Sequence, residues 1–528
     1  MSKTYRPWNP DQDWLLPPSP REWLSEGDMV YFLLDVVKTF DLSAITSKYE
    51  QEGRGFPPFH PRMMVTLLLY GYCMGVYSSR RLQKLCERDA AYRVIVGDDV
   101  PNFRTISDFR KLHLPVLQGL FTQVLTLCRQ AGLLKVGLVS LDGTKVKADA
   151  SRHKAMSYEY MQKEEHRLQE EIAGLLAQAE STDAAEDDLH GREMRGDELP
   201  AELARRESRL VKIQEAKKAL EEQALTAARA EEARRQTEDD KRRAVGETPR
   251  ARQPVDPTPE PKAQRNFTDP ESKIMKVSNL VLSLEGKGFD QCGNAQIVCN
   301  EEQIIVAADV TDQANDKRQV KPMVSQAQQN LTAAGVEEKI GALDADTGYY
   351  SEENVSHLEG ETIDPYIATE RLKHHEKVMG VPDGPTPENL TPKERMARKL
   401  RTKHGRETYA KRKGMIEPIL RDSGQVFGQI KSAEGGRGFR QFLLRGLEKM
   451  RGEWNLIGLT HNLRSYSGAD DGRSPGDDRG RKGKNNPEWS WVRSRRRFRM
   501  TESAHPIFMT RVPPPLRRSS GNAAPTGE

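Results

Sequence analysis

The chain has few cysteines and no long apolar run, and these absences exclude several classes of protein. Its 528 residues include only 5 cysteines, an odd number with no Cys-x-x-Cys pair. We therefore expect reduced thiols, with neither a disulfide framework nor a zinc site. No apolar stretch approaches membrane-spanning length, and the first residues lack the apolar core of a signal peptide. The sequence predicts a soluble, cytoplasmic protein.

Charge is abundant but nearly balanced. Charged residues make up 30% of the chain and hydrophobic residues 36%, so part of the chain must be solvated, and the formal net charge is only +4. This net charge says little about partners. The length allows two to four domains with a sizeable core.

A short apolar run ending in an acid, Leu138–Thr144, is the first candidate part of a functional site. The pattern predicts a buried strand that stops where Asp142 begins. An acid at that place projects from a rigid edge into whatever cleft lies beyond it. The alternative is a solvated acid that opens a turn.

The region before this strand, residues 26–132, is predicted to be a helical N-terminal domain, preceded by an extended arm over residues 1–25. Apolar periodicity and capping residues predict helices over Asp28–Tyr49, over Arg62–Val76, from Arg80 onward, and from Thr105 or Ser107 to about Gly132. The domain carries basic residues that could hold DNA phosphates, namely Arg80, Arg81, Lys84, Arg104 and Arg110. An ordinary helical bundle with a solvated basic face is the alternative.

Residues 155–262 differ in composition from the rest, being rich in Glu, Lys, Arg, Ala and Gln and ending in a Pro-rich linker. Two helical pieces are expected, separated by an acidic break at Ser181–Asp188 and by Gly196. Leucine and isoleucine are too sparse for a long heptad register, so a solvated helical hairpin fits better than a coiled-coil dimer.

Strands resume after the linker. A hairpin is predicted from Ala295 to Asp309, followed by a helix over Arg318–Gly335, a strand ending in Asp346 and another short strand. Residues 371–405 read as irregular, and a basic helix is expected from Glu407 into the 440s. Residues 465–528 read as a disordered tail, in which 479–499 holds nine basic residues with interleaved aromatics. That segment is a candidate nucleic-acid contact, with a plain solvated tail as the alternative.

The order of these elements is that of a ribonuclease-H-like α/β fold. The predicted catalytic domain is a mixed sheet built from residues 133–154 and 263–464, preceded by the all-helical domain and interrupted by the charged insertion. In such a sheet the first and fourth strands are neighbours, which would bring Asp142 and Asp346 together. A third acid on the following helix would complete a site for two Mg²⁺ ions, because Mg²⁺ prefers oxygen ligands.

Several motifs resemble those of one enzyme family. The segment from Tyr409 through Arg412 to Glu417 resembles the Tyr-Arg-Glu signature of DDE transposases from bacterial insertion sequences. The Asp142 and Asp346 segments are similar to the first and second acid motifs of that family. Segments 59–113, 266–276 and 437–446 resemble one subgroup, the insertion-sequence family eleven-eighty-two.

This resemblance implies a transposase that binds terminal inverted repeats, cleaves DNA at the element ends and joins the 3′-OH ends to target DNA. Asp142, Asp346 and Glu417 would be the catalytic metal ligands for two Mg²⁺ ions, with Mn²⁺ as a substitute. Tyr409, Arg412 and Lys431 would contact DNA. The family also implies a homodimer in a synaptic complex, associated with the bacterial nucleoid. A nuclease or resolvase on the same fold, and an inactive or domesticated DNA-binding derivative, are the alternatives.

Two other acids compete for the second position. Asp344 shares a strand face with Asp346, because side chains alternate, so periodicity does not separate them. The Asp-x-Gly-Tyr pattern favours Asp346. Asp309 also ends an apolar strand, but it belongs to the predicted hairpin, away from the site.

The sequence departs from the family pattern after Glu417. Seven residues, 419–425, separate Glu417-Pro from the family's Val-Phe-Gly-Gln-Ile-Lys segment, which ends at Lys431. Two extra helical turns would keep Lys431 on a similar face and shift it by roughly 10 Å along the axis. Gly424 breaking the helix is the alternative.

Overall fold

The computed structural model describes residues 20–50, 57–97, 99–190, 201–248, 251–277, 288–370, 380–381, 387, 389–420, 422–423, 426–427, 429–431 and 436–470. The statements below concern these residues. The extended arm predicted for residues 1–25 lies outside them up to residue 19, and Pro20–Trp23 form a single 3-10 turn, η1. Among the described helices, none is both long and apolar enough to cross a membrane.

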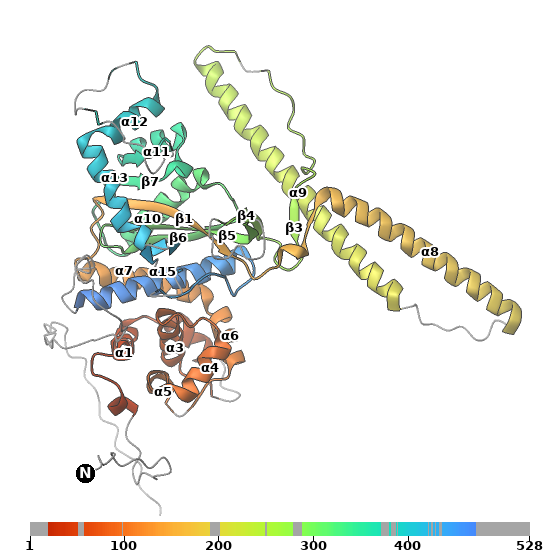
Figure 1. Ribbon diagram of the computed structural model, residues 1–528, viewed down its shortest axis with the longest axis horizontal. Helices are drawn as coiled ribbons and strands as arrows, with labels where there is room; N and C mark the ends of the chain where they lie inside the picture. Colours follow the sequence, from red (N-terminus) through yellow and green to blue (C-terminus); the bar gives the residue numbers. More distant parts are fainter. Residues whose placement is uncertain are drawn as a thin grey trace, which may run out of the picture. The chain divides into compact units, whose positions relative to one another are not determined.

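The N-terminal part is helical (Figure 1). Its helices are α1 (Met29–Thr39), α2 (Ser43–Glu50), α3 (Pro61–Cys73), α4 (Ser79–Arg88), α5 (Ala90–Val96), α6 (Phe103–Leu112) and α7 (Leu114–Gln130).

Two helices predicted as continuous are each divided in two. The helix predicted over Asp28–Tyr49 ends at Thr39, because the backbone is extended at Phe40 and Asp41 accepts from the N–H of Ser43 at 2.9 Å. The helix predicted up to about Gly132 is α6 followed by α7, since Pro115 begins a new helix and cannot continue the old one. Asn102 caps α6, in place of the predicted Thr105 or Ser107.

A mixed sheet forms the centre of the catalytic part. Its strands are β1 (Leu138–Lys147), β4 (Lys273–Lys276), β5 (Phe289–Asn300), β6 (Ile305–Thr311), β7 (Ala342–Ala345) and β8 (Asp364–Ile367). The order is β4-β5-β1-β7-β8, with β6 also paired to β5. The β5–β6 hairpin is antiparallel, whereas β1, β7 and β8 run parallel. The prediction that the Asp142 and Asp346 strands are neighbours is confirmed by the register Leu138↔Ala342 to Leu141↔Ala345.

The prediction that the first strand stops at Asp142 is wrong. Strand β1 continues to Lys147 because β5 pairs with it antiparallel along its whole length, from Val139↔Asn300 to Lys147↔Cys292. Pairing with β7 ends at Leu141↔Ala345. Asp142 therefore lies inside β1, at the point where its parallel neighbour has ended.

Further helices and short elements surround this sheet. They are η4 (Asp316–Gln319), α10 (Val320–Ala333), η5 (Thr347–Tyr349), α11 (Glu352–Gly360), α12 (Pro392–Arg401), α13 (Lys403–Met415), α14 (Glu417–Leu420), β9 (Asp422–Ser423), β10 (Val426–Phe427) and α15 (Leu447–Asp470).

Three predictions for this region need correction. The prediction of a long basic helix from Glu407 is wrong, because α13 ends at Met415 and α14 at Leu420, and the β9–β10 pair follows from Asp422. Part of the stretch predicted to be irregular is α12, which begins with a capping box at Thr391. The tail boundary at 465 is also wrong, because α15 continues to Asp470; residues 471–528, including the basic segment 479–499, lie outside the described part.

One hydrophobic core runs through the N-terminal and catalytic parts. Helix α15 packs against α7, α3 and β6, and buried side chains from α1 to α15 belong to a single cluster. In Figure 1, α7 and α15 lie side by side beneath the sheet. All five cysteines are free and buried.

The charged insertion is a helical hairpin. Helices α8 (Tyr158–His190) and α9 (Ala201–Ala244) pack on each other, and the short strands β2 (Ala155–Ser157) and β3 (Gln264–Asn266) pair at its base. A small cluster that includes Met161, Leu168 and Ile213 joins the two helices. The predicted acidic break at 181–188 is helical and belongs to α8, while Gly196 lies outside the described residues.

Candidate active site

Three acids predicted as metal ligands converge on the end of the parallel strands. Asp142 lies on β1, Asp346 follows the last residue of β7, and Glu417 opens α14. Arg412 of α13 joins them: its Nη2 is 2.5 Å from Asp142 Oδ2, and its Nη1 is 3.8 Å from Glu417 Oε1. Asp142 and Glu417 thus share one guanidinium.

Burial is the main influence on the Asp142 carboxyl. It raises the pKa of Asp142 to about 6; the Arg412 charge opposes this shift, and the Asp346 charge adds to it. The N–H of Gly143 also donates to Asp142 Oδ1 at 2.8 Å. Asp142 is therefore held by one cation and one backbone donor, in a site that contains further negative charge.

Asp346 sits in a tight turn after β7. Its carboxylate caps η5 and accepts from the N–H of Gly348 at 2.8 Å. A Cβ added at Gly348 would lie 3.0 Å from Asp346 Oδ1, which is closer than neighbouring atoms normally tolerate. The Asp-Thr-Gly-Tyr sequence thus fits a cap that leaves little space for a side chain at its third position.

The structure separates Asp344 from Asp346. Asp344 is completely buried, and Ser140 Oγ lies 2.7 and 2.8 Å from its two carboxylate oxygens. Burial raises the pKa of Asp344 to about 7. Asp346 is only half-buried and lies beyond the strand end, where a ligand can reach it. Asp309 lies on β6, opposite Gln296 in the sheet, and is ion-paired to Arg451 at 2.9 Å.

The donor chemistry fits a hard divalent cation, because carboxylate oxygens are the ligands that Mg²⁺ prefers. Among the described residues no three acidic, His or Cys side chains are already grouped closely enough to hold a metal ion. Arg412 supplies the positive charge at this place instead, and its side chain is only 11% exposed. A metal ion bound at Asp142 would therefore share this carboxylate with Arg412 or displace the guanidinium from it.

Tyr409 and Arg412 lie one turn apart on α13, as predicted. Burial raises the pKa of Tyr409 to about 12, so its hydroxyl is protonated at neutral pH. The predicted continuous helix from Arg412 to Glu417 is interrupted at Ile416, and Pro418 follows Glu417. Glu417 therefore begins a new short helix.

Lys431 does not lie on an extended helix, so the alternative of two extra turns with a shift of about 10 Å along the axis is wrong. Gly424, where the other alternative places a helix break, lies outside the described residues. The chain turns back after Leu420: the N–H of Gln429 donates to the Pro418 carbonyl at 2.8 Å, and that of Ile430 to the Ile419 carbonyl at 3.2 Å. Lys431 Nζ then donates to Thr144 Oγ1 at 2.8 Å and to the Lys145 carbonyl at 3.1 Å. The segment that ends at Lys431 therefore packs back against the start of α14, and Lys431 reaches β1, beside Asp142.

One of the predicted DNA contacts in the N-terminal part is buried. Arg110 is 4% exposed, and its Nη1 donates to the Tyr72 hydroxyl at 3.1 Å and to the Tyr77 carbonyl at 2.9 Å. It holds helices together, so the expectation that it reaches a phosphate is wrong. Arg80, Arg81, Lys84 and Arg104 are exposed, and the Arg80 and Arg104 guanidinium groups lie 5.1 and 5.8 Å from the Phe103 ring centre.

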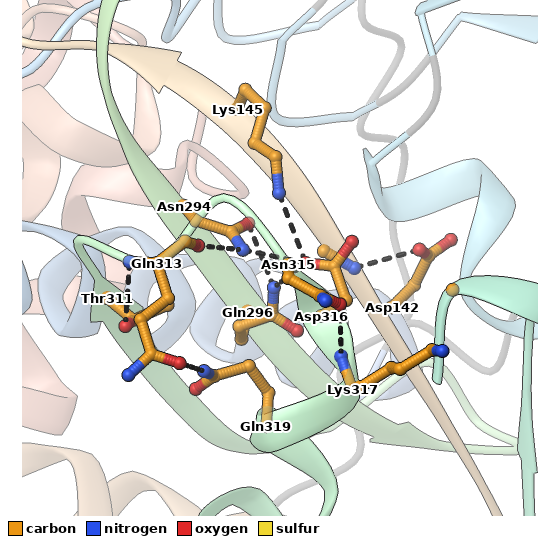
Figure 2. Close-up of polar contacts among 12 residues, drawn as sticks. Asp142, Lys145, Asn294, Gln296, Thr311, Gln313, Asn315, Asp316, Lys317 and Gln319 are labelled. Carbon is orange, nitrogen blue, oxygen red and sulfur yellow. Dashed lines mark hydrogen bonds and ion pairs between the residues drawn. The ribbon is translucent and has the colours of Figure 1, made fainter. Parts of the chain in front are cut away.

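The sequence reasoning missed Asp316 and the amides of Asn294 and Gln296. Figure 2 shows these side chains converging with Lys145 beside the Asp142 segment. The available signal was Asn315-Asp316, a capping residue followed by an acid just before a helical stretch. Asp316 lies in a turn and does not end an apolar strand, so the pattern of an acid at the end of a strand does not indicate it.

Comparison with known families agrees with this geometry. Residues 18–112 match the model of a transposase domain (DUF772), and residues 282–447 match that of the transposase DDE domain. The second match includes Asp346 and Glu417, while Asp142 precedes it, beyond the charged insertion. No curated protein and no solved structure matches the chain. The chain therefore contains a DUF772 transposase domain followed by a DDE transposase domain, the catalytic domain of enzymes that cleave DNA and transfer its strands.

Proposed function

We propose that this protein is the transposase of a bacterial insertion sequence and acts on element ends within the cytoplasm, at the nucleoid. It binds the terminal inverted repeats, cleaves the DNA at the element ends and joins the 3′-OH ends to target DNA. The observation that supports this best is that Asp142 and Glu417 share the Arg412 guanidinium, while Asp346 lies at the end of β7, the neighbour of β1. The subgroup resemblance to insertion-sequence family eleven-eighty-two belongs to the same proposal.

The three acids would hold two Mg²⁺ ions on a ribonuclease-H-like sheet. When bound, the ions supply activation of the attacking oxygen and stabilisation of the leaving 3′ oxygen. Asp142 is fixed by β1, Asp346 by its cap on Gly348, and Glu417 by the start of α14. Their backbones come from three separate elements of one core, which suits a site that must hold its geometry while DNA enters and leaves.

Arg412 and Tyr409 are proposed to contact the DNA strand at this site. Arg412 is well suited to the role because a guanidinium binds phosphate oxygens through two parallel hydrogen bonds. Once metal ions replace it at Asp142, its charge becomes available to a phosphate. For Lys431 we propose that it supports β1 through Thr144, since the residue is only 5% exposed and its ammonium donates to the Thr144 hydroxyl; the predicted phosphate contact stays untested.

The N-terminal helices are proposed to bind the terminal repeats. Arg80, Arg81, Lys84 and Arg104 place exposed positive charge on α4 and α6, and such residues bind phosphates independently of base sequence. Two element ends must be held together for joining, so we also propose a homodimer in the synaptic complex.

The test uses the purified full chain with DNA that carries paired terminal repeats, in Mg²⁺. We expect the wild type to cleave and join, and Asp142→Asn to bind this DNA while losing at least about a hundredfold in rate, because a metal ligand contributes several kcal/mol. Asp149→Asn is the matched control, since Asp149 pairs with exposed Arg445 just beyond β1. Joining that survives in Asp142→Asn would refute the metal site.

Two other results would favour the alternatives. Cleavage by the wild type without any joining would identify a nuclease on this fold. Binding without cleavage or joining would identify an inactive derivative. Inverted repeats that flank the gene, bordered by a short duplicated sequence, would support the transposase independently of any assay.

A further inference from the structure

We propose that Asp316 is a positioning residue of the active site, which holds the turn carrying Asp346 against β1 and β5. The inference rests on the proposed function, because it takes Asp346 as a metal ligand. Asp316 opens η4, just after the β5–β6 hairpin, and has no place in the predicted triad of acids.

The Asp316 carboxylate is fixed by three donors. Its Oδ1 accepts from Lys145 Nζ at 3.1 Å, from Asn294 Nδ2 at 2.6 Å and from Gln296 Nε2 at 3.0 Å (Figure 2). Asn294 and Gln296 are completely buried. Hydrogen bonds to an ionised acceptor are roughly twice as strong as neutral ones. Three such hydrogen bonds to Oδ1 restrict the Asp316 carboxylate to a single orientation.

The Gln296 amide relays this orientation to the Asp346 turn. An ionised carboxylate only accepts, so it fixes the NH₂ end of the Gln296 amide toward itself and the carbonyl end away from it. That carbonyl oxygen, Oε1, accepts from the Tyr349 hydroxyl at 2.5 Å. Tyr349 is fully buried and ends η5, the turn that Asp346 caps. Gln296 Nε2 also donates to Asn294 Oδ1 at 2.9 Å, so Asp316 and Asn294 together present the carbonyl end of the amide to Tyr349.

Direct packing joins the two turns as well. A Cβ added at Gly348 would lie 3.0 Å from Asp346 Oδ1 and 3.6 Å from Asp316 Oδ2, so both carboxylates border the same glycine. The Asn354 amide donates to the Lys317 carbonyl at 2.7 Å and to the Tyr349 carbonyl at 2.8 Å. The Asn354 side chain therefore connects η4 and η5 by donating to a backbone carbonyl of each turn.

Strand β1 is adapted to this network. Gly143, next to Asp142, lies opposite Gln296 in the sheet. A Cβ at Gly143 would lie 2.2 Å from Gln296 Nε2 and would displace the amide. The glycine after Asp142 therefore leaves the space that the amide needs, and the network reaches both acids.

The network supports the site without joining it. Asp316 Oδ1 is occupied by its three donors, so the carboxylate acts through Gln296 and Tyr349. Residues that orient a metal ligand typically contribute 10–100-fold to metal affinity or activity. The structure assigns that kind of role to Asp316.

The test compares Asp316→Asn with wild type in the full chain. An Asn side chain keeps the shape but can turn an NH₂ group toward Gln296, and it loses the charge that pairs with Lys145. We expect Mn²⁺ binding, measured by calorimetry without DNA, to weaken about 10–100-fold. Single-turnover cleavage should fall by a similar factor, while affinity for repeat DNA stays unchanged. Asp309→Asn, which removes another ion-paired acid near the same hairpin, is the control and should match wild type.

A double-mutant cycle tests the route through Tyr349. Tyr349→Phe removes only the hydroxyl that meets Gln296. If Asp316 acts through this bond, the double variant loses no more Mn²⁺ affinity than the weaker-binding single variant. Additive losses, or wild-type Mn²⁺ affinity in Asp316→Asn, would overturn the inference. Should Asp316→Asn fail to fold, Tyr349→Phe alone decides, and unchanged Mn²⁺ affinity in it overturns the inference.

The same experiment separates this inference from the proposed function. Asp346→Asn is measured in parallel. Cleavage that persists in Asp346→Asn would refute the proposed metal site itself. An inactive Asp346→Asn beside a fully active Asp316→Asn would leave the site in place and reject only the positioning role.

Discussion

Arg412 donates to Asp142 at 2.5 Å, so the most basic side chain of the site is bonded to the first of its predicted metal ligands. The guanidinium also lies 3.8 Å from Asp344 and from Glu417. One buried cation thus compensates several carboxylates that would otherwise repel each other. In the absence of metal, the Arg412 charge opposes the increase in pKa that burial causes at Asp142 and Asp344.

Replacing Arg412 with Gln should destabilise the metal-free protein by about 3–5 kcal/mol, because it leaves buried carboxylates without a cation. Added Mg²⁺ should restore part of the loss, since it supplies the missing charge. Chemical unfolding in EDTA and in Mg²⁺ measures both effects. Arg445→Gln, which removes an exposed pair with Asp149, should cost at most about 1 kcal/mol. If Mg²⁺ stabilised Arg412→Gln no more than wild type, the guanidinium and the metal would not share a site.

Replacing Lys431 with Met should lower the free energy of unfolding by about 1.5–3 kcal/mol, because the charged donor to Thr144 and to the Lys145 carbonyl is lost. The salt dependence of DNA binding should not change, since the ammonium is committed to β1. Fluorescence titrations of repeat DNA at several salt concentrations provide the measurement. A slope of log K against log salt that is reduced by about one would instead reveal a phosphate contact.

Replacing both Arg80 and Arg104 with Gln should weaken DNA binding. The slope of log K against log salt should also fall by about one for each phosphate that the variant no longer neutralises. The effect should be similar for repeat DNA and for unrelated DNA, because phosphate contacts carry no sequence information. Arg129→Gln, which removes a donor to the Gly335 carbonyl at 3.0 Å, is the control. An unaltered salt slope in the double variant would exclude this face from DNA binding.

His461 should make stability depend on pH. It is 2% exposed, its Nε2 lies 2.9 Å from the Gln303 carbonyl oxygen, and burial lowers its pKa to about 3. The unfolded chain takes up a proton near pH 6.5 and the folded chain does not, so stability falls as pH drops from about 6.5 toward 3. The slope contributed is up to about 1.4 kcal/mol per pH unit. Urea unfolding between pH 7.5 and 5.5 should show less pH dependence in His461→Gln; an identical dependence in the variant would contradict the prediction.

Predictions from the sequence succeeded for strands whose formation depends on the apolar pattern of their own residues. Alternating or continuous apolar residues located β1, the β5–β6 hairpin and β7. The Asp-x-Gly-Tyr pattern favoured Asp346 over Asp344, and in the structure this pattern is a turn that Asp346 caps. The same reasoning failed where a distant partner decides the outcome. Strand β1 continues beyond Asp142 because β5, about 150 residues later, pairs with it.

The region around Lys431 shows the same limit. Family spacing left two alternatives open, a displaced lysine on a longer helix or a helix break at Gly424. The position of Lys431 depends on backbone bonds from Gln429 and Ile430 to Pro418 and Ile419 that no periodicity indicates. Arg110 looked like one more surface cation, and only packing against Tyr72 and Tyr77 buries it. Asp316 was missed because its partners, Asn294 and Gln296, become its neighbours only in the folded sheet.

The packing of α15 against α3 and α7 has a consequence for synthesis of the chain. The first helices of the protein make their core with a helix that begins about 380 residues later, at Leu447. Contacts of such long sequence separation form late. While the ribosome is still translating residues before 447, the nascent N-terminal part lacks one side of its core. The N-terminal helices therefore reach their final packing only when nearly the whole enzyme has emerged, and a truncated messenger would yield a chain with exposed apolar surface and no complete domain.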